Sequence, residues 1–230
     1  MRPERLAAIL GKTEIFEGLD AQALGSLAES SGLRSYGKGD LILRQGELAD
    51  VLLVLVEGLA KVVVTSEKGD EMLLTTLRPF QIFGELSFAD GQPRSASVEA
   101  LGPCTVTALE RATLLELARQ HPSITERLLR YLSAMVRRTT EQALDLVCLP
   151  LPSRIAKLLV SFAEVSGEGT EPEIVLDLPF NQSDIAQMVG GTRQSVNHAL
   201  RSFEARGYLK LRGKKIVLLR LDRLRLRASG

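Results

Sequence analysis

The chain has 230 residues, of which 45% are hydrophobic and 25% are charged, and its formal net charge at pH 7 is +1. Its longest purely apolar run, Val51 to Val56, falls far short of the roughly 20 residues that a membrane-spanning helix needs. The N-terminus mixes charged with apolar residues, so it lacks the clean apolar core of a secretory signal. The sequence therefore predicts a cytoplasmic protein without a membrane partner, and its length favours two domains.

The sequence shows no pattern typical of catalysis or metal binding. Cys104 and Cys148 are too few and too far apart for a metal or iron–sulfur site, and we expect both thiols to be buried and reduced. Neither a nucleophile paired with a base nor a Walker-type loop is recognisable. We therefore expect no catalytic residue and no metal site, and the chain is not predicted to be an enzyme.

Charge is distributed unevenly along the chain. Residues 179–230 hold 11 Lys and Arg against three Asp and Glu, whereas residues 1–178 hold 18 against 25. A basic C-terminal region on an acidic body is typical of nucleic-acid binding, although a solvated basic face gives the same count. Charge alone leaves both interpretations open.

The first half of the chain changes from a helical to a β pattern. Residues 4–31 carry apolar side chains at helical spacings, with Gly18 and Gly32 as breaks. From Leu33 to Glu110, short β runs are separated by glycine-containing turns about every ten residues, which is typical of an antiparallel sandwich or jelly roll. The expected strands are 41–43, 51–56, 61–66, 72–77, 96–100 and 105–109.

One glycine-bounded segment, residues 84–97, combines unlike chemistries. Arg94 offers a fixed fork of donors for a phosphate, and Ser95 adds a hydroxyl. Glu85 can only accept hydrogen bonds, so beside a phosphate site it indicates a ligand with a hydroxyl donor, such as the 2′-OH of a ribose. A surface loop with an ordinary ion pair is the plainer interpretation of these residues alone.

The segment resembles the phosphate-binding cassette of cyclic-nucleotide-binding domains, in which Gly-Glu-Leu and Arg-Ser are separated by a short turn. In this chain Gly84, Glu85 and Leu86 are followed by Arg94 and Ser95. The resemblance implies that Glu85 takes the ribose 2′-OH and that Arg94 and Ser95 take the cyclic phosphate. It also implies that the surrounding β runs form the β-roll of that family.

A short helix is expected over residues 113–118, and a long helix follows from His121-Pro122 to about Cys148. At 1.5 Å per residue, about 26 residues make a rod of roughly 40 Å, longer than a compact domain needs for itself. Its apolar positions alternate spacings of three and four, which predicts a coiled-coil homodimer through residues 122–148 rather than a helix lying on the β-roll. The seam residues are Leu129, Leu132, Val136, Thr139, Ala143 and Leu146.

Two adjacent threonines, Thr139 and Thr140, lie at this seam. Adjacent helix positions point about 100° apart, so one hydroxyl can face the ligand of its own subunit while the other faces across a dimer. Aligned on Arg154-Ile155-Ala156, they take the places of a hydroxyl pair that touches the adenine of cyclic AMP in the catabolite activator branch of the family. Threonines bonded back to their own helix, without a ligand contact, are the alternative.

The chain between the long helix and the last module predicts a hinge and a supporting helix. Leu149-Pro150-Leu151-Pro152 has few alternative conformations, so we expect a stiff hinge there. Ser153 is expected to cap a helix from Arg154 to about Val165. A loop and a short strand over residues 174–178 lead into the final module.

The final module has the pattern of a helix-turn-helix. Asn181 and Thr192 are expected to cap helices over 182–189 and 193–206, with a glycine turn between them. The second helix presents outward residues of the types that read base edges and phosphates, and a hairpin over 208–219 with a basic tip would reach the DNA backbone. The predicted DNA-binding residues are Thr192, Arg193, Gln194, Asn197, His198, Arg201, Lys214 and Lys215.

From Gln182 to Leu219 the sequence resembles the winged helix-turn-helix of the CRP/FNR regulators, so the resemblance covers nearly the whole chain. It implies an α+β fold. The expected parts are a cyclic-nucleotide-binding β-roll, or jelly roll, over residues 1–118, a long dimerisation helix and hinge over 119–149, and a winged helix-turn-helix DNA-binding domain over 150–230.

The resemblance implies a dimeric transcription regulator in which cyclic AMP binds each β-roll and reorients the two DNA-binding domains. The implied partners are double-stranded DNA, with a pseudo-palindromic operator, and RNA polymerase. Cyclic GMP is an alternative ligand, because the cassette would hold its ribose phosphate equally well, and a constitutive DNA-binding protein with a vestigial pocket is an alternative of another class. The catabolite activator has Arg, Glu and Arg where this chain has Arg193, Gln194 and His198, so the DNA half-site stays open.

Overall fold

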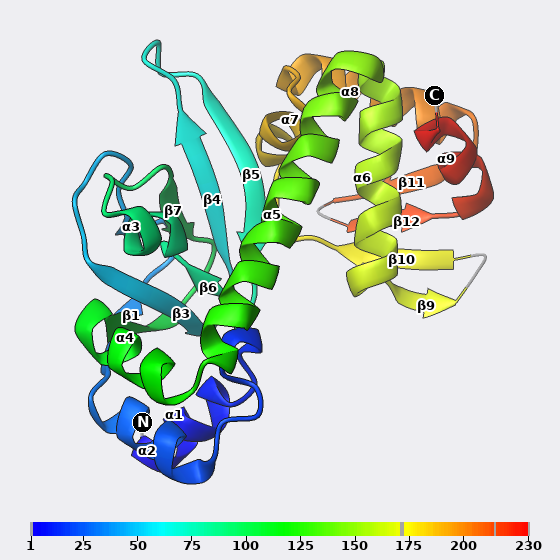
Figure 1. Cartoon of the computed structure of the whole chain (residues 1–230). Coiled ribbons are helices and arrows are strands. Elements are labelled where there is room, and N and C mark those ends of the chain that lie inside the picture. The colour runs from blue at the N-terminus through cyan, green and yellow to red at the C-terminus, as the bar shows by residue number, and fades with distance from the viewer. Residues whose placement is uncertain (1, 171–172, 214, 230) are drawn as a thin grey trace. The chain divides into compact units, whose positions relative to one another are not determined.

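The computed structural model describes residues 2–170, 173–213 and 215–229, and the chain divides into two compact units. The first unit comprises residues 1–136 and the second residues 137–230. Helix α5, Ser123–Cys148, crosses this boundary (Figure 1). Each unit buries hydrophobic side chains of its own.

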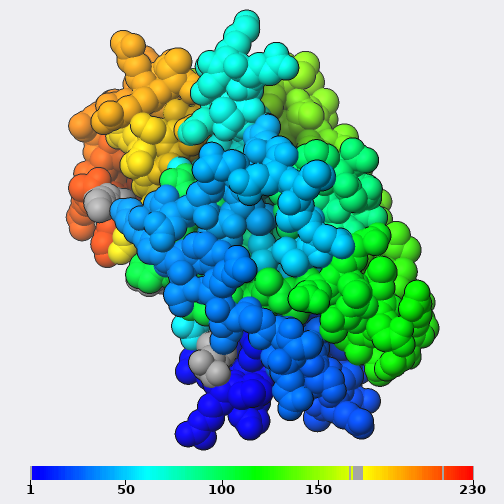
Figure 2. Space-filling view, turned by 90° about the vertical axis from the view of Figure 1, so that its left-hand side faces the viewer, coloured from blue at the N-terminus to red at the C-terminus, as the bar shows by residue number. Residues whose placement is uncertain are grey.

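The N-terminal unit is a β-roll of two four-stranded antiparallel sheets. The strands are β1 (Gly32–Tyr36), β2 (Leu41–Leu43), β3 (Val51–Glu57), β4 (Ala60–Thr65), β5 (Glu71–Leu77), β6 (Ile82–Phe83), β7 (Ser97–Ala100) and β8 (Cys104–Glu110). One sheet has the order β1-β8-β3-β6 and the other the order β2-β7-β4-β5. The six strands predicted from the sequence are confirmed, and β1 and β6 are additional. The β4–β5 hairpin projects from the β-roll (Figures 1 and 2).

Strand β3 is apolar along its length because both of its faces are buried. Successive side chains of a strand point to opposite faces. Leu53 and Leu55 lie in the core between the two sheets, whereas Leu52 and Val54 lie in a second core on the other side of the strand. A strand covered on both faces needs no polar positions, which explains the run from Val51 to Val56.

Helices complete the second core of this unit. It joins side chains of α1 (Pro3–Leu10), α2 (Ala21–Glu29), α4 (Arg111–Gln120) and the start of α5 to those of β3, and a 3-10 helix over Glu14–Phe16 contributes to it (Figure 1). The short helix α3 (Glu85–Asp90) lies between β6 and β7. The first turns of α5 are therefore anchored to the β-roll, with Ile124 buried.

The C-terminal unit combines a helix-turn-helix with a small sheet. Its elements are α6 (Leu151–Ser166), β9 (Glu168–Thr170), β10 (Glu173–Asp177), α7 (Gln182–Val189), α8 (Arg193–Ala205), β11 (Leu209–Arg212), β12 (Lys215–Leu218) and α9 (Leu221–Ala228). The antiparallel sheet has the order β11-β12-β10-β9. Apolar side chains of α6, α8 and α9 share one core with those of the sheet. The predicted α+β architecture with a winged helix-turn-helix is confirmed.

Three details of the prediction are wrong. Helix α6 begins at Leu151, so Ser153 does not cap it but lies buried in its first turn, and Pro150 occupies the N-cap. Pro152 fits the first helical turn because its fixed φ and missing N–H suit that position, so 151–152 is helix rather than hinge. Cys104 is buried as expected, but Cys148 is exposed. Within the described residues, every helix is too short or too polar to cross a membrane.

Candidate nucleotide-binding cassette and DNA-binding face

Two left-handed glycines delimit the cassette. Gly84 (φ 75°) is the N-cap of α3, and Gly91 (φ 70°) ends this helix after six residues. A Cβ on Gly84 would collide with the guanidinium of Arg94, whereas a Cβ on Gly91 would meet open space. Both positions require a conformation that favours glycine, but only Gly84 also needs the missing side chain so that Arg94 can approach.

Arg94 is buried, with 3% of its surface exposed, and its guanidinium is fixed by backbone oxygens. Nη1 donates to the carbonyl oxygen of Gly84 at 2.6 Å and also to Oγ of Ser87, while Nη2 donates to the carbonyl oxygen of Val51 at 2.8 Å. The backbone N–H of Arg94 donates to the carbonyl oxygen of Glu47 at 2.9 Å. These bonds join the start of α3, the start of β3 and the loop before it around one cation.

One nitrogen of the Arg94 guanidinium has no partner among the described residues. This nitrogen, Nε, is buried. Burial lowers the pKa of the Arg94 guanidinium from its ordinary value, and the nearby carboxylates of Glu85 and Asp50 oppose this shift. A buried cation with an unsatisfied donor is unfavourable until an acceptor reaches it, and an oxyanion would supply both the acceptor and the opposite charge.

The other cassette residues surround this cation. Glu85 is buried, with 8% exposed, and its carboxylate is close enough to act on the charge of Arg94. Ser95 is exposed and Leu86 is 38% exposed. The structure therefore brings Glu85 and Arg94 together in a buried place, with Ser95 next to Arg94 on the surface.

The sequence did not indicate two residues that support the cassette. Ser87 is buried, accepts from Arg94 and donates to the carbonyl oxygen of Gly84 at 3.3 Å. Arg111 donates from Nε to the carbonyl oxygen of Phe88 at 3.1 Å and forms an ion pair with Asp50 at 3.5 Å. Both residues act on groups that only the folded backbone brings near, and no local motif marks them.

Thr139 and Thr140 are exposed on the part of α5 that belongs to the C-terminal unit. Much of the predicted seam is exposed as well: Leu129 is 60% and Val136 62% exposed, and Thr139 and Ala143 are exposed. Leu132 and Leu146 are half-buried. Most of the apolar stripe of α5 is thus left uncovered by the single chain.

The helix-turn-helix is built by the caps that the sequence predicts. Asn181 and Asp184 form a capping box at the start of α7, with the Asn181 Oδ1 accepting from the backbone N–H of Ser183 at 2.7 Å. Gly190 turns the chain at φ 60°. Oγ1 of Thr192 then accepts from the backbone N–H of Ser195 at 3.1 Å and starts α8. These caps stabilise the first turns of α7 and α8 by satisfying backbone N–H groups that have no partner within the helix.

Helix α8 buries one face and exposes the other. Its buried side chains are Val196, Ala199, Leu200 and Phe203. The predicted DNA-binding residues Thr192, Arg193, Gln194, Asn197, His198 and Arg201 are all exposed. Lys215 is exposed too and forms an ion pair with Asp177 at 2.9 Å, whereas Lys214 lies outside the described residues.

Glu204 links α8 to the hairpin and was not singled out from the sequence. Its Oε1 accepts from the backbone N–H of Leu211 at 2.9 Å, and its Oε2 accepts from Nη1 of Arg201 at 2.8 Å. The N–H of Leu211 and then Arg201 hold the pKa of the Glu204 carboxyl below its ordinary value. This carboxylate fixes strand β11 against the end of the helix that presents the polar face.

Two family models match the chain. The model for the cyclic nucleotide-binding domain matches residues 33–121, and the model for the Crp-like helix-turn-helix domain matches residues 153–227. The first match includes the whole cassette, and the second includes α7, α8 and the hairpin.

Known proteins resemble the chain over most of its length. The "CRP-like cAMP-activated global transcriptional regulator" of Mycobacterium tuberculosis is 34% identical over 96% of this chain and 98% of its own. The "cAMP-activated global transcriptional regulator CRP" of Pasteurella multocida is 30% identical over 81% of this chain and 89% of its own. A solved structure of a CRP/FNR family transcriptional regulator from Thermus thermophilus is 25% identical and has a TM-score of 0.72. That match covers 86% of this chain and 99% of the other.

Proposed function

This chain belongs to the CRP/FNR family of transcription regulators, and we propose that it is a homodimeric member whose β-roll binds cyclic AMP. It has a cyclic nucleotide-binding domain and a Crp-like helix-turn-helix domain, so it is a DNA-binding regulator. The observation that carries the ligand proposal is the buried guanidinium of Arg94, whose Nε lacks a partner among the described residues and lies in a cassette with buried Glu85.

Each cassette residue has a separate role in this proposal. The cyclic phosphate accepts from Nε of Arg94 and from the hydroxyl of Ser95, and it replaces the missing solvent around the buried cation. The carboxylate of Glu85 accepts from the ribose 2′-OH. Gly84 permits the close approach of Arg94, and Leu86 covers the sugar with apolar surface. Sugar and phosphate are thereby fixed, while the base is left for other residues to recognise.

We assign recognition of the base to Thr139 and Thr140. They lie on α5, whose exposed apolar seam is the surface proposed for the homodimer through residues 122–148. Adenine is favoured over guanine because the relatives at 34% and 30% identity are named as cAMP-activated regulators. The assigned domains remain 1–118 for the β-roll, 119–149 for the dimerisation helix and 150–230 for DNA binding.

DNA binding is assigned to the exposed face of α8 and to the hairpin after it. Arg193, Gln194, Asn197 and His198 would reach base edges, and Arg201 with the lysines of the hairpin would contact phosphates. Two such domains related by a dimer axis read two half-sites, so the operator is expected to be pseudo-palindromic. RNA polymerase is the proposed protein partner, and a cytoplasmic location accords with this role.

The ligand proposal is tested by pairing a variant with a modified ligand. Calorimetric titration of the wild-type chain with cyclic AMP and with 2′-deoxy cyclic AMP is expected to show weaker binding of the deoxy compound, by about tenfold or more, since a hydrogen bond to a charged group is lost. Glu85→Gln should weaken the binding of cyclic AMP by a similar factor but leave the binding of the deoxy compound nearly unchanged. Glu57→Gln, at an exposed carboxylate of the same unit, is the matched control.

Other outcomes separate the alternatives. If removal of the 2′-OH lowers the affinity by the same factor in the wild type and in Glu85→Gln, the role given to Glu85 is refuted. Tighter binding of cyclic GMP than of cyclic AMP would change the assigned base, and the absence of binding by either nucleotide would favour the constitutive DNA-binding protein.

A further inference from the structure

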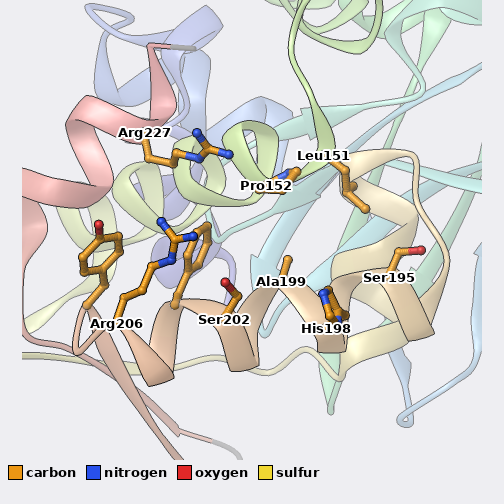
Figure 3. A pocket seen from close by; sticks show the side chains of 10 residues that line it. Leu151, Pro152, Ser195, His198, Ala199, Ser202, Arg206 and Arg227 are labelled. Atoms are coloured by element: carbon orange, nitrogen blue, oxygen red, sulfur yellow. The ribbon is translucent and has the colours of Figure 1, made fainter.

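The C-terminal unit contains a hollow to which the proposed function assigns no ligand. It has a volume of about 370 Å³ and lies between the start of α6, one side of α8 and the end of α9 (Figure 3). Arg206, which directly follows α8, and Arg227 of α9 extend into it, and Leu151 and Pro152 line it from α6. None of the ten described residues that line the hollow is acidic.

The two arginines differ from most of their neighbours in having no partner. Among the described residues, neither Arg206 nor Arg227 forms an ion pair or a side-chain hydrogen bond, whereas Arg201, Arg220 and Arg225 each pair with a carboxylate. Guanidinium groups keep their charge near neutral pH, so two of them lining one hollow give it a positive character. An anion placed between them would accept from both donor forks.

The hollow is longer than a single phosphate. Ser195 lines it from the first turn of α8, and Arg206 lines it from the position directly after the helix. The two are eleven positions apart, a separation of about 16 Å along the helix axis. Its arginine end also carries the hydroxyls of Ser202 and Tyr208. Between the two ends the wall is apolar, formed by Pro152 and other side chains such as Ala199 and Phe203.

We propose that this hollow binds a small organic anion. Its oxyanion group, a phosphate or a carboxylate, lies between Arg206 and Arg227, and its apolar body lies against Pro152, Ala199 and Phe203. The volume of about 370 Å³ lies in the range of about 300 to 1,000 Å³ that is typical of small-molecule sites. The site lies wholly in the C-terminal unit and does not depend on the cassette at Arg94.

The occupant would lie close to the DNA-binding face. His198 lines the end of the hollow opposite the arginines and is also one of the exposed residues assigned to DNA (Figure 3). A ligand in this hollow would therefore be a second input to the regulator, applied directly to the domain that contacts DNA.

The test uses simple probes on the full chain. Phenyl phosphate, benzoate and neutral benzyl alcohol are titrated calorimetrically, and we expect saturable binding of at least one of the two anions and none of the alcohol. Arg206→Gln/Arg227→Gln should weaken the binding of the anion by about tenfold or more, since charge-assisted hydrogen bonds are lost. Arg223→Gln/Arg225→Gln removes the same charge outside the hollow and should leave the affinity nearly unchanged.

The single variant Arg227→Gln changes an exposed position in the last turn of α9, so it keeps the test valid if the double variant fails to fold. It should also weaken the binding of the anion. Binding of phenyl phosphate alone, or of benzoate alone, identifies the oxyanion and supports the site. The proposal is overturned if neither anion binds, or if both double variants weaken anion binding equally. It is also overturned if anion binding survives Arg206→Gln/Arg227→Gln but is lost in Arg94→Gln. A role of the arginines in DNA binding alone would also overturn it: their loss would then weaken binding of duplex DNA, and neither probe would bind.

Discussion

At the scale of single residues, Arg94 holds its loop in place and is also the proposed phosphate-binding group. Its two Nη atoms are bonded to Gly84, Val51 and Ser87, whereas Nε has no partner in the described part of the chain. Removing Arg94 would therefore disturb the loop as well as the ligand site. The Glu85→Gln variant with a deoxy ligand avoids this ambiguity, because it compares one carboxylate with one hydroxyl.

The contact between Gly84 and Arg94 leads to a paired prediction. Gly91→Ala is expected to lower the free energy of unfolding of the N-terminal unit by about 1 kcal/mol, the cost of a left-handed alanine in open space. Gly84→Ala carries the same backbone cost and also displaces the buried guanidinium, so it should cost at least about 1 kcal/mol more.

Urea unfolding and cyclic AMP titration of both variants check this prediction. Gly84→Ala should also lose ligand affinity, whereas Gly91→Ala should retain most of it. Equal losses in the two variants, in stability and in binding, would show that Gly84 is needed for its backbone conformation alone.

At the scale of elements, α5 presents an apolar stripe that the single chain leaves mostly uncovered. Val136 lies in the stripe and is 62% exposed, and Arg137 follows it about 100° around the helix. Val136→Glu is expected to convert a dimer into a monomer, because a charge would be buried in the seam without a partner. Arg137→Glu is the control, since it changes charge off the stripe. Sedimentation velocity measures the oligomeric state of both variants. A Val136→Glu variant that remains dimeric would rule out this seam as the interface.

The link between α8 and β11 predicts a pH dependence. The pKa of Glu204 is lowered in the folded chain, so its contribution to stability is present above the ordinary pKa of 4.5 and is lost as pH falls through the folded value. Glu204→Gln should therefore lower the melting temperature at pH 7, and this difference should shrink towards pH 3.

Glu164→Gln is the control for that prediction. Its carboxylate pairs with Arg225 at 3.4 Å on an exposed surface, so its loss should change the melting temperature less. If the effect of Glu204→Gln were the same at pH 3 and pH 7, the ionised carboxylate would not be the stabilising form.

Elements with strong local signals could be predicted from the sequence. Short β runs between glycine turns predicted the main strands, and the caps Asn181 and Thr192 predicted α7 and α8. Helix α9 was not predicted, because the helix is recognised by the burial of Leu221 and Leu224, which only the folded chain shows. The two-residue strand β6 depends on pairing with β3 rather than on its own pattern.

The candidate site was likewise predictable only in part. Glu85 and Arg94 were predicted because their residue types and spacing form a motif, and the structure brings them together. The roles of Ser87, Arg111 and Glu204 depend on contacts with backbone atoms that only the folded chain places nearby. No periodicity or spacing encodes such contacts.

At the scale of the whole molecule, α5 is the element that runs from the N-terminal unit into the C-terminal unit. It begins with residues packed on the β-roll and ends in the C-terminal unit, where Thr139 and Thr140 lie. A ligand can shift the orientation of the DNA-binding domains only if it binds one arrangement more tightly than another. Contact of the base with both helices of a dimer would provide that difference, because the contact depends on how the two helices are placed.

The proposed coupling is tested most directly by titrating cyclic AMP into the wild-type chain with and without saturating DNA, using a duplex that the protein itself enriches from a random pool. We predict that DNA tightens cyclic AMP binding, by about 5- to 150-fold for a typical coupling, and that cyclic AMP tightens DNA binding by the same factor. Identical cyclic AMP affinities in the two titrations would contradict the coupling of ligand to DNA.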